Sequence, residues 1–222
     1  MKLSWRTEWP HALVLVAMFG VAIASWGSTP DRIPVHWGWS GQPGRWGGRF
    51  EGLLLLPLVA LALYLLMVLL PRIDPGRSNY GAFAGPYATI RLALLVLLAG
   101  AAGLIQLELR GHRTHPMVTL PLLLGLFFIA IGSVIGKLEP NWFVGVRTPW
   151  TLSSRRSWEA SNRLAGRVMV VEAVLLFVAA AFHRPWALVA AIACFLLGMI
   201  ATVVYSYRVW RDDPARVPPA AS

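Results

Sequence analysis

Three ionisable side chains, Arg91, Glu108 and Glu172, fall inside long apolar stretches of the chain. A charged group near the middle of a bilayer costs about 2.5–3.5 kcal/mol to insert, so such residues usually pair, face the protein interior or serve transport. We expect Arg91 and Glu172 to face the interior of a helix bundle, where a pair between them is one possibility. Such a pair would either orient two helices or carry out a function, and both roles remain open. For Glu108 we expect Arg110, Arg113 or the Gly/Trp-rich segment described below as neighbours.

A second group of chemically capable residues lies in one short stretch, residues 137–163, called here the motif loop. Arginine and hydroxyl side chains there suit the binding of a phosphorylated headgroup or of a protein partner. Pro140 and Pro149 exclude one continuous helix. Ser153 or Ser154 is placed to cap a helix that begins at Arg155 and leads into the next apolar segment. The candidate binding residues are Asn141, Trp142, Arg147, Thr148, Pro149, Trp150, Ser153 and Trp158.

Glycine, proline and tryptophan dominate a third stretch, residues 28–51, called here the outer loop. Its singled-out residues are Pro34, His36, Trp37, Gly41 and Gly44. Glycine and proline there predict successive turns that fold the aromatic rings onto the membrane surface. A metal site needs three or four converging ligands, so a single histidine predicts no bound metal. The chain also shows no motif for a cofactor or for hydrolytic or phosphoryl-transfer catalysis, so we expect no cofactor, no catalytic residue and no enzyme.

Composition indicates what must hold these residues in place. Of the 222 residues, 57% are hydrophobic and 14% are charged, with a mean hydropathy of +0.60. This argues against a disordered chain and against direct binding of nucleic acid. Six segments are long and apolar enough to span a bilayer as helices. We therefore predict an all-α polytopic membrane protein with spans near Pro10–Gly27, Gly52–Leu70, Tyr87–Leu109, Met117–Gly136, Leu164–Phe182 and Trp186–Val209.

Most of the 20 Lys and Arg residues fall in the N-terminal segment, the loop after the second span, the motif loop and the C-terminal tail. Positive residues collect on the cytoplasmic side, so both termini are predicted to be cytoplasmic. The first span also resembles a signal peptide, with Lys2 and Arg6 before it, and we expect it to be retained.

Parts of the sequence resemble a known family. The run from Pro140 to Ser154, followed by Trp158 and by Arg163-Leu164-Ala165-Gly166, is similar to the signature of the SdpI family. The outer loop, together with Ile73-Asp74-Pro75, Asn79-Tyr80, Phe83, Tyr87 and Ile90-Arg91, resembles the domain of unknown function that commonly precedes that signature. One departure is Ser161-Asn162, which stands where family members usually have Thr-His.

The resemblance implies a multi-pass protein of the bacterial plasma membrane. It also implies immunity to, or sensing of, a secreted membrane-active toxin peptide, and a cytoplasmic repressor as a possible partner beside the lipid bilayer. It divides the chain into residues 1–91, with two spans and the outer loop, and residues 92–222, with four spans and the motif loop. The alternatives are a small transporter or a lipid-headgroup-binding protein and, less favoured, a membrane enzyme.

Overall fold

The computed structural model describes residues 4–38, 41–112 and 114–217. Its elements follow the chain in the order α1 Trp5–Ser25, β1 Ile33–Trp37, β2 Pro43–Gly47, η1 Phe50–Leu54, α2 Leu55–Ile73, η2 Arg77–Gly81, α3 Ala84–Leu109, α4 Pro116–Ile135, α5 Pro149–Leu152, α6 Arg155–Phe182 and α7 Pro185–Arg211. Six helices in the described chain are long and apolar enough to cross a membrane. The predicted six-span helical architecture is therefore confirmed.

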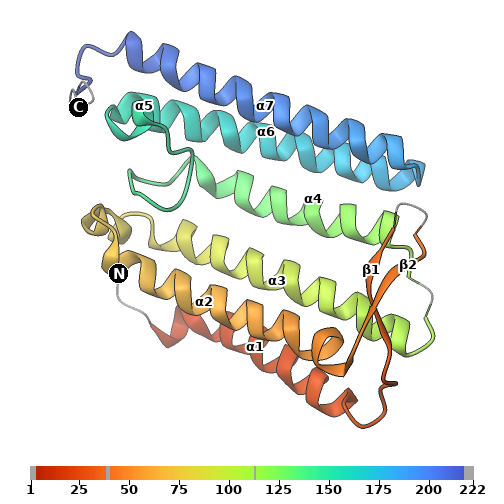
Figure 1. Ribbon diagram of the computed structural model, residues 1–222. Helices are drawn as coiled ribbons and strands as arrows, with labels where there is room; N and C mark the ends of the chain where they lie inside the picture. The colour runs from red at the N-terminus through yellow and green to blue at the C-terminus, as the bar shows by residue number, and fades with distance from the viewer. Residues whose placement is uncertain (1–3, 39–40, 113, 218–222) are drawn as a thin grey trace.

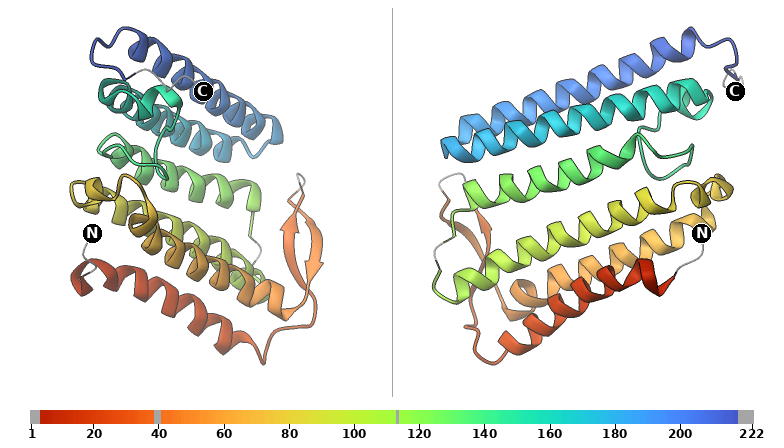
Figure 2. Two further views of the ribbon diagram at one scale, coloured as in Figure 1. Left: turned by 60° about the vertical axis from the view of Figure 1, so that its left-hand side comes forward. Right: turned by 180° about the vertical axis from the view of Figure 1, so that it is seen from behind.

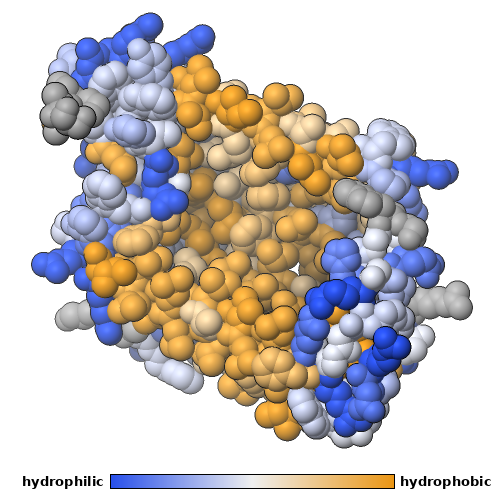
Figure 3. Space-filling view, viewed as in Figure 1, coloured by the Kyte–Doolittle hydropathy of each residue, from blue (hydrophilic) through white to orange (hydrophobic). Residues whose placement is uncertain are grey.

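The long helices run roughly alongside one another in two groups, α1–α3 and α4 with α6 and α7, which meet between α3 and α4 (Figure 1). The start of α1, the end of α7 and the motif loop lie at one end of the bundle, called here the motif-loop end (Figure 1 and Figure 2). The β1–β2 hairpin lies at the other, called here the hairpin end (Figure 2). On the face of the bundle seen in Figure 3, an apolar band lies between two polar ends. The cytoplasmic placement of the motif-loop end stays a prediction from the positive charges.

Two predicted helix boundaries differ from the structure. The first helix begins at Trp5 rather than Pro10, because Ser4 caps it by accepting a hydrogen bond from the Arg6 amide at 3.3 Å. The fifth long helix begins at Arg155 rather than Leu164, since α6 is one continuous helix of 28 residues. Its cap is Ser154, one of the two predicted serines, which accepts from the Ser157 amide at 3.0 Å.

The outer loop is not a series of turns but a two-stranded antiparallel hairpin, β1 paired with β2. Ile33 pairs with Gly47 and is completely buried against Gly52, where an added methyl group would lie 2.7 Å from the Ile33 Cδ1 atom. The hairpin turn includes Gly41, whose φ of +75° suits glycine. The hairpin is thus anchored on the start of the second span.

Helices α4 and α6 of the second group pack closely against each other. At Gly132 of α4 and Gly166 of α6 the backbones touch, since a Cβ atom on Gly132 would lie 2.7 Å from the Gly166 carbonyl oxygen. Small residues allow this close approach between membrane helices. The predicted division of the chain after residue 91 falls inside the continuous helix α3. This division stays a prediction.

Candidate functional site

Asn141 organises the first half of the motif loop. Its side chain is 1% exposed, and both its amide oxygen and its amide nitrogen form hydrogen bonds. The Oδ1 atom accepts from the amides of Phe143 and Val144 at 3.0 and 2.7 Å, and the Nδ2 atom donates to the carbonyls of Glu139 and Val144, each at 3.0 Å. Buried amide side chains of this kind hold a loop by replacing backbone pairing. Asn141 therefore shapes the loop from within and is not available to a ligand.

Asp74, which follows α2, fastens the motif loop to the first helix group. This buried carboxylate accepts from the Gly76 amide at 2.6 Å, the Tyr80 hydroxyl at 2.8 Å and the Trp142 amide at 3.0 Å. Burial and then the hydrogen bond to Asp74 raise the pKa of Tyr80 far above its usual value, so this hydroxyl stays protonated as a donor. Asn79 adds a bond of 2.7 Å from its side chain to the Pro140 carbonyl.

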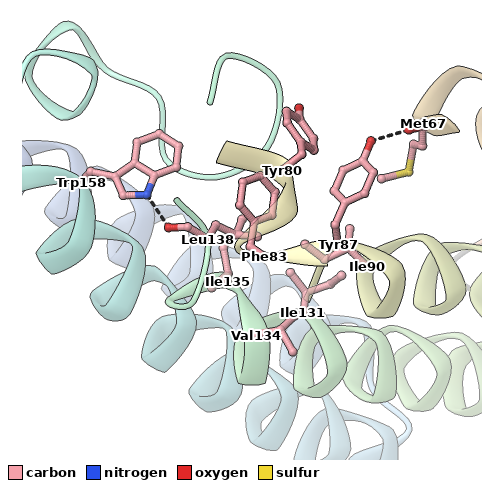
Figure 4. Close-up of a cluster of buried hydrophobic side chains, with 10 residues drawn as sticks. All are labelled: Met67, Tyr80, Phe83, Tyr87, Ile90, Ile131, Val134, Ile135, Leu138 and Trp158. Atoms are coloured by element: carbon pink, nitrogen blue, oxygen red, sulfur yellow. Dashed lines mark hydrogen bonds between the residues drawn. The ribbon is translucent and has the colours of Figure 1, made fainter. Parts of the chain in front are cut away.

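Trp158 and Asn162, one turn apart on α6, hold the loop from the other side. The Trp158 indole donates to the Leu138 carbonyl at 2.6 Å. Asn162 accepts from the Val146 amide at 2.8 Å and donates to the Trp158 carbonyl at 2.9 Å, and both side chains are completely buried. Figure 4 shows Trp158 at the edge of an apolar cluster that also includes Tyr80, Phe83 and Tyr87 from the first helix group.

A threonine pair begins α5. Thr148 caps the short helix by accepting from the Thr151 amide at 3.1 Å, and Thr151 accepts in return from the Thr148 amide at 2.8 Å. Pro149 occupies the first helical position, which suits a residue without an amide hydrogen. The Thr148 hydroxyl also lies 3.1 Å from the hydroxyl of Ser206 on α7.

The exposed part of the motif loop is much smaller than the predicted set. Trp142 is 54% exposed, and Arg147 and Pro149 are also exposed. Arg147 donates to the Trp142 carbonyl at 2.8 Å, which holds these two side chains on one surface. Trp150 is partly buried against the ring of Tyr207, with centroids 5.2 Å apart. Of the predicted binding residues, therefore, those best placed to meet a partner are Trp142, Arg147 and Pro149.

The C-terminal tail folds back onto the end of α5. Asp213 accepts from the Ser154 hydroxyl at 2.5 Å, and the Val217 amide donates to the Ser153 carbonyl at 3.0 Å. The Ser154 hydrogen bond, and then the Ala215 amide, lower the pKa of the Asp213 carboxyl below its ordinary value. Ser153 meanwhile donates through its hydroxyl to the Pro149 carbonyl at 2.7 Å.

On the outer loop, Pro34 is buried while His36 is exposed, and Trp37 is partly buried against the core. Arg45 lies opposite His36 in the hairpin, and an added Cβ atom on the adjacent Gly44 would be 3.4 Å from the His36 Nδ1 atom. The described residues contain no cluster of three or more His, Cys, Asp or Glu side chains placed for a metal ion. The hairpin is therefore a shaped surface with no metal-binding geometry in its described part.

Arg91 pairs with Glu8 and not with Glu172. Arg91 on α3 is 1% exposed and donates to the two carboxylate oxygens of Glu8 at 2.7 and 3.0 Å. Tyr64 on α2 donates to the same carboxylate at 2.8 Å, so the pair joins all three helices of the first group. Sequence reasoning missed Glu8, because the first span was placed to begin after it.

The other two intramembrane acids have different surroundings. Glu172 is 2% exposed, and its Oε2 atom has no hydrogen-bond partner among the residues that the structure describes. It lines a cavity of about 270 Å³ between α6 and α7. Glu108 accepts from the backbone amide of Thr114 at 2.8 Å and from the Thr114 hydroxyl, rather than from a neighbouring arginine such as Arg110. Arg113, another predicted neighbour, lies outside the described residues.

A larger cavity, about 690 Å³, opens among α1, α2, α3 and α4 towards the hairpin end. Its walls are almost entirely apolar, with Gln106, Arg110 and Thr119 as polar exceptions. Gly103 of α3 lines it, and an added Cβ atom there would meet nothing within 4 Å. A cavity of this size and lining can accept an apolar side-chain cluster or a lipid chain.

Comparison with known proteins gives two family matches. Residues 137–206 match the SdpI/YfhL protein family, and residues 13–61 match a domain of unknown function, DUF1648. The chain is also 25% identical over 199 residues to "Immunity protein SdpI" of Bacillus subtilis (strain 168), covering 90% of this chain and 93% of that protein. No solved structure matches it.

These matches fall on the regions that carry the structural features above. The first includes the motif loop with α6 and most of α7, and the second includes the outer loop with most of α1. The predicted resemblance is therefore confirmed. The chain is a multi-pass protein of the bacterial plasma membrane that carries an SdpI/YfhL-family segment preceded by a DUF1648 segment.

Proposed function

We propose that this protein protects its cell against a membrane-active peptide that arrives from outside, and that it does so without enzymatic chemistry. The observation that carries the proposal is the similarity to an immunity protein along nearly the whole of both chains. Similarity of this extent includes the hairpin and the motif loop. Fold alone does not establish function, so the proposal needs a site that can perform the protective step.

The apolar cavity at the hairpin end is the site we assign to peptide capture. It is lined by three membrane-embedded helices of the first group and by α4. A membrane-active peptide carries an apolar face, and that face would exchange lipid for protein contacts in the cavity. The hairpin beside it carries exposed Trp46, and its Arg45 forms an ion pair with Glu51 of η1; these groups suit the polar and interfacial part of the same peptide.

Filling the cavity tests this assignment. Gly103→Leu places a side chain in open space inside it, and Gly20→Leu on α1 is a matched control, because its Cβ atom also meets nothing within 4 Å but does not line the cavity. A peptide-sensitive bacterial host expressing each variant would be challenged with the killing peptide, and survival counted. We expect wild type and Gly20→Leu to protect and Gly103→Leu to protect less. Unchanged killing in the presence of wild type would refute the proposed function.

The finer part of the proposal is that the motif-loop end engages a cytoplasmic repressor. The exposed pair Trp142 and Arg147 supports it, because aromatic and arginine side chains are enriched where proteins meet. Trp142→Ala combined with Arg147→Ala would be compared with wild type in the native host, with transcripts measured with and without peptide. We expect survival to persist and the peptide-dependent transcript response to disappear. An unaltered transcript response would remove the repressor from the proposal.

A further inference from the structure

A groove between α4 and α6 at the motif-loop end gathers positive charge and is bordered by Lys137 and Arg163, the first and last residues of the motif loop. Its volume is about 580 Å³. Its lining combines three cations, three glycines, one serine and two valines, namely Lys137, Arg163, Arg167, Gly132, Gly136, Gly166, Ser133, Val170 and Val171.

The three cations in this groove have no acidic partner in the described chain. The nearby carboxylates of Glu139 and Glu159 are both held by Arg155, at 2.9 and 3.1 Å. The other ion pairs at this end use Arg91 and Arg211, so Lys137, Arg163 and Arg167 form no ion pair with any described residue. Positive charges gathered in one groove without counter-charges favour an anionic occupant.

The floor of the groove leaves room for such an occupant. Gly132 and Gly166 line the groove where the two helix backbones are in contact, so these two positions add no side chain to its floor. At Gly136 an added Cβ atom would lie 3.1 Å from the Cγ atom of Arg163, so a larger residue there would displace the arginine. The Ser133 hydroxyl at the same level of α4 already donates to the Ala130 carbonyl at 2.8 Å, so the donors that remain for an occupant come from the three cations.

Further along α6 the groove becomes apolar. Val170 and Val171 follow Arg167, and they are 41% and 59% exposed on the outer side of the helix. The groove therefore changes from cationic to apolar along the direction that runs from the membrane surface into the bilayer. A phospholipid has the same order of chemistry, with a phosphate at the surface and acyl chains below it.

We propose that this groove is a binding site for an anionic glycerophospholipid. Lys137, Arg163 and Arg167 hold the phosphate and its acidic headgroup, and Val170 and Val171 contact one acyl chain. The occupant is a lipid rather than free phosphate, because the apolar part of the groove continues the cationic part. This site is separate from the proposed peptide cavity, which lies at the opposite end of the bundle, and it does not depend on the proposed function.

The test measures lipid binding to the purified full-length protein. The groove variant combines Lys137→Gln, Arg163→Gln and Arg167→Gln. The control variant combines Arg72→Gln, Arg77→Gln and Arg208→Gln, which removes the same charge from exposed positions at the same end but outside the groove. Native mass spectrometry would count phosphatidylglycerol and phosphatidylcholine bound to each protein, and thermal unfolding in detergent would report whether each variant is folded.

We expect wild type and the control variant to bind phosphatidylglycerol in preference to phosphatidylcholine. The groove variant should bind phosphatidylglycerol about 100-fold more weakly, because each Lys or Arg near an anionic lipid contributes roughly a factor of five. Equal binding by the groove variant would overturn the proposal, and so would an equal loss in the control variant, since that would indicate general charge attraction. Glycerol phosphate, added as a soluble competitor, should not displace the lipid, and displacement would favour a site for the phosphate group alone.

Discussion

Arg91 and Glu8 form a two-point ion pair between α3 and α1, in which the Nη1 and Nη2 atoms of Arg91 donate to the Oε2 and Oε1 atoms of Glu8. The Arg91 guanidinium also lies 5.7 and 5.6 Å from the ring centroids of Tyr64 and Tyr87. The charge is therefore compensated on one side and covered by aromatic rings on the other. This arrangement explains how the first helix group keeps an arginine inside an apolar bundle.

Removing one partner of this pair should destabilise the protein strongly. Glu8→Gln leaves the buried guanidinium of Arg91 without its counter-charge, which costs roughly 3–5 kcal/mol in comparable pairs. Thermal unfolding in detergent measures the loss. The exposed pair Arg45–Glu51 provides the control, because Glu51→Gln should cost about 1 kcal/mol or less. The double variant Arg91→Met with Glu8→Leu should recover much of the loss, and a double variant as unstable as Glu8→Gln would contradict this explanation.

Replacing Glu172 should have the opposite effect on stability. Its Oε2 atom lacks a partner among the described residues, so Glu172→Leu removes an uncompensated polar group from the bundle and should stabilise the fold by roughly 2 kcal/mol. The matched control is Glu108→Leu, which loses the Thr114 contacts and should destabilise. Unfolding temperatures measured in detergent would show whether Glu172→Leu stabilises the fold and Glu108→Leu destabilises it.

A second substitution of Glu172 tests whether this residue has a structural or a functional role. Glu172→Gln keeps the size of the side chain and removes its charge. If Glu172 serves protection, the variant should assemble normally and protect a sensitive host less well than wild type. Normal assembly with full protection would show that the carboxylate has no part in protection.

Gly145→Ala should disrupt the motif loop. Gly145 has a φ of +114°, and an added Cβ atom would lie 2.7 Å from the Asn162 Oδ1 atom, which accepts the Val146 amide. Backbone strain together with the weakened buried hydrogen bond should cost about 2–4 kcal/mol. Gly81→Ala is the control, since its Cβ atom would meet nothing within 4 Å. Hydrogen exchange of residues 141–152 would report the change, and equal protection in both variants would rule out the proposed strain.

Acid should release the C-terminal tail. The hydrogen bonds from Ser154 and Ala215 lower the pKa of the Asp213 carboxyl from its ordinary value of 3.8, so this carboxylate stabilises the folded tail. That contribution is fully present above the ordinary value and is lost as the pH falls through the lowered value. Hydrogen exchange of residues 212–217 between pH 2 and 7 would follow it. Asp213→Asn should remove the pH dependence and Asp212→Asn should keep it, whereas an unchanged profile in Asp213→Asn would assign the effect to another group.

The six spans were predictable because each is a long apolar segment with its own composition signal. The pairing of Arg91 was not, because hydropathy reports the depth of a residue and says nothing about which helix lies beside it. Pro10 also hid Glu8, since proline usually marks the first turn of a helix and here lies in the second. The capping serine, which depends only on neighbouring residues, was predictable.

The hairpin was missed because glycine and proline are depleted in strands, and the outer loop is rich in both. Its pairing contains register shifts between Pro34 and His36 and between His36 and Trp37, which remove the regular alternation that identifies a strand. In the motif loop, the residue types predicted a structured segment. They did not show that Asn141 and Trp158 face inward, because polar and aromatic side chains serve equally well as internal supports and as contact surfaces.

The return of the C-terminal tail onto Ser153 and Ser154 has a practical consequence for protein engineering. Because Asp213 and Val217 contact Ser154 and Ser153, which link α5 to α6, a fusion joined closely after α7 would disturb these contacts. A reporter attached there for a topology measurement would disturb the surface whose location it is meant to report. A spacer that begins after Val217 would leave those contacts intact.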